Sequence, residues 1–168
     1  SKLPKHSLGT KFLFEQGHII GALAKKKFHT GIDIPEDKDN LETTKKLLLK
    51  RKILFEAGIL SNNKYSRADI LVPVGKDKWD VIEVKGSTKV KPNHIDDLSF
   101  QLQVYLDAGL KIRKCFLLLI NPDFRKKGKI DLNKFFIKED VTDKVLEKSG
   151  VAERTEEFLT IINDKKPP

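Results

Sequence analysis

Two carboxylates stand inside runs of otherwise apolar sequence, where an ionised group is costly unless a positive charge accompanies it. Asp69 lies in the run 68–72, and Glu83 lies in the run 81–85, two residues before Lys85. Two carboxylates beside an ammonium suit a hard divalent cation, because Mg²⁺ prefers oxygen ligands and is commonly held by one or two carboxylates. The pattern indicates a metal-assisted site. A buried ion pair between acid and lysine, without a metal, is the structural alternative.

The chemistry that this set would support is hydrolysis of a phosphodiester. Asp69 and Glu83 would bind the metal, and the backbone carbonyl of Val84 would add a ligand. Lys85 would orient or deprotonate a metal-bound water and help to neutralise the scissile phosphate. Because side chains alternate between the faces of a strand, Glu83 and Lys85 point the same way and Val84 points into the other layer.

The register of the hairpin that carries these residues decides whether they meet. Residues 75–77 read Gly-Lys-Asp, which predicts a turn between two strands. With a turn of three residues, Asp69 stands directly opposite Glu83. A turn of four residues would place Asp69 opposite Val84, and a bulge would be needed to restore the site.

A predicted helix after the hairpin carries further polar side chains that are candidates for the site. Gln101 and Tyr105 are four residues apart and share one helix face, with Asp97 one turn earlier. A neighbouring apolar stripe should pack on the sheet and consists of Leu98, Leu102 and Leu106. Taken alone, the same residues also suit a half-buried core tyrosine and a surface glutamine.

The elements that must position these side chains follow from the periodicity of apolar residues. Helices are predicted at 11–28, 41–51, 95–108, 142–148 and 152–162, and strands at 53–60, 65–74, 79–85, 114–120 and 135–137, with a loop at 31–40. The first helix has its apolar face at Ile19, Ile20, Leu23, Ala24 and Phe28. The expected fold class is α/β, a central mixed sheet with flanking helices. We expect one domain over 1–168, with a fragment of a longer chain as an open alternative.

The charge composition indicates which classes of partner the chain could bind. The 168 residues hold 33 Lys and Arg against 24 Asp and Glu, a net charge of +9, which suits a polyanion such as nucleic acid. A solvated lysine-rich surface is the alternative. No apolar run approaches the ~20 residues of a membrane span, so no membrane partner is expected and a cytoplasmic location is the default.

Taken together, these motifs resemble the PD-(D/E)XK nuclease superfamily, in its RecB-like branch. The resemblance rests on Asp69, on Glu83-Val84-Lys85 and on the Gln101-to-Tyr105 spacing, and it extends from about Phe14 to Val145. That branch includes the nuclease domains of RecB and AddB and the CRISPR-associated RecB-like exonucleases. Segments 14–17, 82–88, 96–101 and 128–132 are also similar to an uncharacterised bacterial family.

The resemblance implies a restriction-endonuclease-like fold. It implies that Asp69 and Glu83 are metal ligands and that Lys85 is the catalytic lysine. It also implies that Gln101 and Tyr105 line the DNA groove beside the site.

The chain departs from the branch in several places. The usual Gly-x-x-x-His of the first helix is absent, because the fourth residue after Gly17 is Gly21. His18 lies on the same helix and is a candidate metal ligand; a partly exposed surface histidine is the alternative. A neutral imidazole ligand would favour Mn²⁺. The single Cys115 excludes a four-cysteine iron–sulfur cluster in this chain. No helicase motif is present in the sequence, so any unwinding would come from a partner or from missing sequence.

Other residues are candidates for supporting roles. The RecB-like branch often has an acidic residue where Glu56 stands, so Glu56 is a candidate second-metal ligand or neighbour of the ligands, with a plain strand edge as the alternative. Lys89, Lys91 and the 125–129 loop would follow phosphates without reading sequence.

Four residues outside the motifs are expected to be structural or solvent-facing. Trp79 should pack at the end of the hairpin, with stacking on a base as the alternative. Cys115 should lie in the core. His6 and His94 should lie at the surface.

We therefore expect a deoxyribonuclease that uses Mg²⁺ or Mn²⁺ and acts on DNA ends or single strands in repair, recombination or defence. The resemblance favours an exonuclease. Two alternatives stay open: a catalytically inactive nucleic-acid-binding module of the same fold, and a nuclease directed at RNA.

Overall fold

A computed structural model describes the backbone of residues 8–150 and the side chains from Glu15 onward. The strands are β1 (Ile32–Asp33), β2 (Leu54–Ser61), β3 (Lys64–Val74), β4 (Lys78–Val84), β5 (Lys111–Ile120) and β6 (Phe136–Asp140). The helices are α1 (Leu8–Lys27), α2 (Asn40–Leu48), α3 (Pro92–Asp107), α4 (Leu132–Phe135) and α5 (Thr142–Ser149).

The strands form one six-stranded mixed sheet in the order β1-β2-β3-β4-β5-β6. Short turns join β2, β3 and β4, so these strands are antiparallel, whereas α3 crosses over between β4 and β5 and makes that pair parallel. The α/β class and the mixed sheet agree with the sequence-based prediction.

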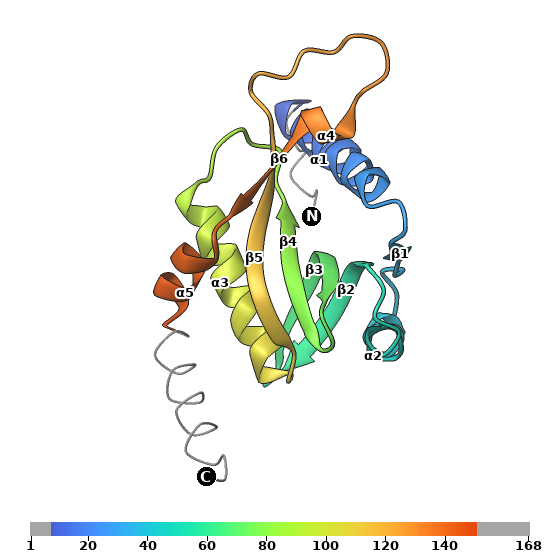
Figure 1. Cartoon of the computed structure of the whole chain (residues 1–168), viewed down its shortest axis with the longest axis vertical. Helices are drawn as coiled ribbons and strands as arrows, with labels where there is room; N and C mark the ends of the chain where they lie inside the picture. The colour runs from blue at the N-terminus through green and yellow to red at the C-terminus, as the bar shows by residue number, and fades with distance from the viewer. Residues whose placement is uncertain (1–7, 151–168) are drawn as a thin grey trace, which may run out of the picture.

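Helices cover both faces of the sheet (Figure 1). The α3 helix packs on one face through Leu98 and Leu102, and α5 joins it there through Val145. On the opposite face, Ile20 and Ala24 of α1 pack on the sheet near the C-terminal end of β4. The two faces therefore carry separate hydrophobic cores.

The β5 strand contributes to both cores. Cys115, Leu117 and Leu119 face α3, while Phe116 and Leu118 face α1. A strand that lies between two neighbours and under two helix layers needs apolar residues at every position. This explains the continuous apolar run and confirms Cys115 as a core residue.

Several predicted elements differ in detail from the structure. The predicted 31–40 loop contains the two-residue strand β1, and the predicted second helix ends at Leu48 rather than at Arg51, whose φ is +52°. Ile19 was expected on the buried face of α1 but is 59% exposed, because that face is narrower than the apolar run. The predicted helix at 152–162 and His6 lie outside the described residues.

No helix in the described part of the chain is long and apolar enough to cross a membrane.

Candidate active site

The β3–β4 hairpin has the register that the three-residue turn predicts. Val74 pairs with Lys78 and Ile70 pairs with Ile82, so the same register carried one residue further sets Asp69 opposite Glu83. The backbone N–H of Val84 donates a 2.8 Å hydrogen bond to Oδ2 of Asp69. The hairpin therefore places both carboxylates at the same level of the sheet.

The two carboxylates stand where β4 leaves β3. Pairing of β3 with β4 ends at Ile70, whereas pairing of β3 with β2 continues to Lys64. A pocket of about 460 Å³ lies on the α1 side of this point and is lined by Asp69, and a hollow of about 400 Å³ lies on the α3 side and is lined by Glu83. Asp69 and Glu83 are thus neighbours at the junction between these two hollows.

Lys85 follows Glu83 on the same face and joins it to α3. Its Nζ lies 2.9 Å from Oδ2 of Asp97 and 3.5 Å from Oε1 of Glu83. Burial opposes the charge of Lys85, but the hydrogen bond to Asp97 and the negative charge of Glu83 outweigh it, so the pKa of Lys85 is raised. The structure therefore holds an ammonium between two carboxylates.

A chain of buried hydrogen bonds from α3 holds the side chain of Glu83. Nε2 of Gln101 donates to Oε2 of Glu83 at 2.9 Å, and the hydroxyl of Tyr105 donates to Oε1 of Gln101 at 2.9 Å. The Tyr105 hydroxyl also lies 3.1 Å from Oγ of Ser66.

The placement of Gln101 and Tyr105 differs from the expectation that both line a DNA groove. Tyr105 is fully buried, and Gln101 is buried except where it borders the α3-side hollow. The shared face of α3 points at the sheet rather than at solvent, so these residues hold Glu83 in place. The alternative of a half-buried tyrosine and a surface glutamine is wrong for the same reason.

Burial is the main influence on the pKa of both carboxylates. Burial raises the pKa of Asp69 well above its usual value, and the charge of Glu83 raises it further against the opposing hydrogen bond from Val84. Burial also raises the pKa of Glu83, although Gln101 and Lys85 oppose the shift. A bound cation would relieve both costs.

Glu56 lies in β2, the strand on the other side of β3 from β4, and it lines the α1-side pocket together with Asp69. Its φ is +58°, a left-handed conformation that is strained for a residue with a side chain. Its carboxylate lies 3.0 Å from Nε of Arg67 and 3.6 Å from Nζ of Lys25, and its carbonyl accepts a hydrogen bond from Nδ2 of Asn40. Glu56 therefore lies beside Asp69 in a network of ion pairs, and its role as a metal ligand or as a neighbour of the ligands stays a prediction.

The donor set fits a hard cation such as Mg²⁺ or Mn²⁺. Asp69, Glu83 and the carbonyl of Val84 are all oxygen donors, and such ions take only one or two carboxylates and complete their coordination with water and phosphate. Across residues 15–150, whose side chains the structure describes, no group of three or more His, Cys, Asp and Glu side chains is placed to hold a metal ion. His18 lines the pocket beside Asp69 from α1, and its role as a ligand stays a prediction.

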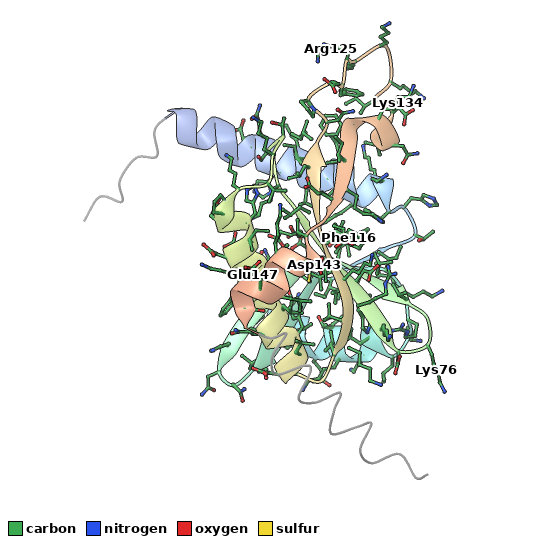
Figure 2. All side chains as sticks on the ribbon, turned by 60° about the vertical axis from the view of Figure 1, so that its left-hand side comes forward. Lys76, Phe116, Arg125, Lys134, Asp143 and Glu147 are labelled. Carbon is green, nitrogen blue, oxygen red and sulfur yellow. The ribbon has the colours of Figure 1, made fainter. Side chains whose placement is uncertain are left out.

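Basic residues lie at the same end of the molecule as the candidate site. Lys89 and Lys91 are exposed on the loop after β4, and the carbonyl of Ser87 in that loop accepts a hydrogen bond from the N–H of Ile120. The loop after Ile120 carries Arg125, which Figure 2 shows at the end of the molecule opposite the hairpin turn at Lys76. These cations can approach a polyanion that reaches the end of β4.

Two of the remaining sequence-based expectations were tested by burial. Trp79 packs in the core as expected, with the guanidinium of Arg51 over its ring at 4.5 Å. His94 is buried rather than at the surface, and its Nδ1 accepts a hydrogen bond from the N–H of Lys91. Burial lowers the pKa of His94, and the charges of Lys85 and Lys91 lower it further.

Two residues at the α3-side hollow are not among the site residues predicted from sequence. Tyr65 of β3 and Phe100 of α3 both line it, and both are exposed. Each sits in a run that predicts an ordinary strand or helix, so an aromatic residue at a polar position was the one available signal.

A scan against models of protein families, a search of curated proteins and a search of solved structures each found no match to this chain.

Proposed function

We propose that the chain is a metal-dependent deoxyribonuclease that hydrolyses phosphodiester bonds at DNA ends or in single strands. One observation carries the proposal. Asp69 and Glu83 meet at the point where β4 separates from β3, and the ammonium of Lys85 lies 3.5 Å from Glu83. The same three residue types carry the resemblance to the PD-(D/E)XK nucleases.

Asp69, Glu83 and the main-chain oxygen of Val84 would hold Mg²⁺ or Mn²⁺. When bound, such a cation lowers the pKa of a coordinated water and stabilises charge on the transferring phosphate. The protein's own contribution is to keep the two carboxylates fixed. The hydrogen bonds from Val84 N–H to Asp69 and from Gln101 to Glu83 do this without occupying every carboxylate oxygen.

Lys85 acts as a cation and hydrogen-bond donor in this proposal. Two carboxylates within 3.5 Å keep its side chain protonated, so orienting the attacking water or a phosphate oxygen is favoured over taking a proton from the water. Its side chain is 23% exposed, which leaves room for substrate contact.

The substrate would be guided by charge rather than by base sequence. Lys89, Lys91 and the loop around Arg125 lie at the end of the sheet that carries Glu83, and the whole chain has a net charge of +9. A helicase or repair protein that delivers DNA ends is a fitting partner for such an enzyme.

The test is a degradation assay on end-labelled linear DNA, single-stranded and double-stranded, with Mg²⁺, Mn²⁺ or EDTA. We expect metal-dependent cleavage that falls about 100-fold or more in Lys85→Ala, the scale seen when one charge-stabilising donor is removed. Lys76→Ala is the matched control, because Lys76 is exposed on the hairpin turn at the opposite end of the molecule. The ladder of products separates exonuclease from endonuclease.

The alternatives give different results in the same assay. Salt-sensitive DNA binding with no cleavage under either metal would favour an inactive binding module. Cleavage of labelled RNA but not of DNA would favour an RNA-directed nuclease. Cleavage that survives in Lys85→Ala would overturn the proposed site.

A further inference from the structure

The α1-side pocket gathers carboxylates from three neighbouring strands. Asp33 of β1, Glu56 of β2 and Asp69 of β3 all line it. The β2–β3 register sets Glu56 opposite Asp69, and β1 pairs with β2 on the far side of Glu56. Like charges in such a pocket disfavour one another's ionised form unless cations lie among them. The pocket therefore requires positive charge.

One ammonium group from the last turn of α1 lies among these carboxylates. Nζ of Lys25 lies 3.0 Å from Oδ2 of Asp33 and 3.2 Å from Oδ1 of the same side chain. It also lies 3.6 Å from Oε1 of Glu56. The Lys25 side chain is 31% exposed and lines the pocket. Lys25 therefore joins α1 to β1 and β2 by ion pairs inside the pocket.

These ion pairs engage both oxygens of Glu56 and leave Asp69 out. Oε1 of Glu56 faces Lys25, and Oε2 lies 3.0 Å from Nε of Arg67. Asp69 accepts the hydrogen bond from Val84 but takes part in none of the ion pairs among the described residues. Asp69 is therefore the carboxylate of this pocket that is left for a cation.

An ammonium and a divalent cation can meet the same electrostatic need at a carboxylate. Sites that cleave phosphodiesters with two metal ions hold them about 3.5–4 Å apart, so the ligands of the second ion must adjoin those of the first. Glu56, opposite Asp69, stands where a ligand of a second ion would be needed. Its charge is already neutralised by Lys25 and Arg67.

From this geometry we propose that Lys25 is a positioning residue that takes the place of a second metal ion. The site then binds one divalent cation, at Asp69 and Glu83, and Glu56 is a neighbour of the ligands rather than a ligand. The inference rests on the proposed nuclease function and adds to it the number of metal ions.

The test counts Mn²⁺ ions bound to the full chain without DNA, so that it does not depend on cleavage. Free Mn²⁺ is followed by electron paramagnetic resonance during a titration. Lys25→Met removes the charge and keeps an unbranched side chain, Lys25→Gln does so with a polar one, and Lys25→Arg keeps the charge. Lys26→Met is the matched control, because Lys26 is exposed on the same helix and does not line the pocket. Ions that Asp69→Asn still binds are counted as background.

We expect one Mn²⁺ above background in the wild type, in Lys25→Arg and in Lys26→Met, and two in Lys25→Met and Lys25→Gln. Loss of the ammonium leaves Asp33 and Glu56 facing one point, and such ions need only one or two carboxylates. Adding Glu56→Gln to Lys25→Met should return the count to one. Thermal unfolding without metal shows which variants are folded.

A single ion in the folded Lys25→Met or Lys25→Gln variant, or two ions in the wild type, would overturn the role of Lys25 and leave the nuclease proposal standing. Two ions in Lys25→Arg would also overturn it, because the charge would then not exclude the second ion. A wild type that binds no Mn²⁺ above background would contradict the metal site itself, and the role of Lys25 would fail with it. If the counts are as expected but no nucleic acid is cleaved, the role of Lys25 stands and the nuclease proposal fails.

Discussion

At the scale of single residues, the candidate site depends on how one carboxylate is held. Ser66, Tyr105 and Gln101 form a buried relay that ends on Glu83, and each hydroxyl or amide in it has a partner. Buried polar groups that are fully paired fix one side-chain position, because any other position leaves a group unsatisfied. The relay therefore explains why Glu83 keeps its orientation with a side chain only 12% exposed.

Tyr105→Phe should break the relay while keeping its shape. The change leaves Gln101 and Ser66 without their buried partner, so we expect a loss of about 1–3 kcal/mol in the free energy of unfolding, measured with urea. Cleavage should also fall, since Glu83 loses its support. Tyr65→Phe is the control for stability, because Tyr65 is 48% exposed and this change should alter the free energy of unfolding by no more than about 0.5 kcal/mol. Equal stability for Tyr105→Phe and wild type would contradict the relay.

Among the elements, the β2 strand has an irregular backbone conformation at Glu56, next to the candidate site. Glu56 has positive φ between Phe55, which faces α1, and Ala57, which faces α3. In a regular strand those two residues would share a face, because they are two apart. The kink at Glu56 therefore switches the face of the strand, and Asn40 secures it through the Glu56 carbonyl.

A pair of variants isolates this strain. Glu56→Ala and Glu56→Gly both remove the ion pairs to Arg67 and Lys25, but only glycine adopts a φ of +58° without steric cost. We expect the glycine variant to be more stable than the alanine variant by about 1 kcal/mol in thermal unfolding.

The same two changes at Glu139 provide the control for Glu56. Glu139 is an exposed residue of β6 that lies outside the set with positive φ, so glycine should be the less stable variant there. The same order at both positions would mean that the conformation of Glu56 carries no strain.

At the scale of the whole molecule, the α3 crossover brings distant segments to one end of the sheet. It makes β4 and β5 parallel, so the site residues after Ile82 and the basic loop after Ile120 leave the sheet in the same direction. It also seals Cys115 under α3 in the core.

This arrangement makes Cys115 a reporter of global unfolding. Burial raises the pKa of its thiol to about 12, and the charges of Asp80 and Asp140 add to the shift, so the reactive thiolate is scarce at neutral pH. We expect no reaction with an aromatic disulfide reagent in the folded protein and one equivalent of reaction in concentrated guanidinium, followed by absorbance. Rapid reaction of the native protein would mean that the core around Cys115 opens locally.

The local elements were predictable from sequence, and the hairpin was limited to two registers. Periodicity located the strands and the main helices, and the structure has the three-residue turn at 75–77 that sets Asp69 opposite Glu83. Both depend on interactions between residues close in the chain, which sequence spacing reports directly. The two-residue strand β1 was missed because it exists only through pairing with the distant strand β2.

Residue spacing is enough to predict which residue types reach the end of the β3–β4 hairpin, and in what order. What surrounds them depends on contacts between distant segments. The tertiary fold buries Tyr105, Gln101 and His94, exposes Tyr65 and Phe100, and places Asp69 and Glu83 at the junction of two hollows. The reason is that the spacing of residues on a helix or strand shows which of them share a face. Which face meets the sheet depends on packing between segments far apart in the chain.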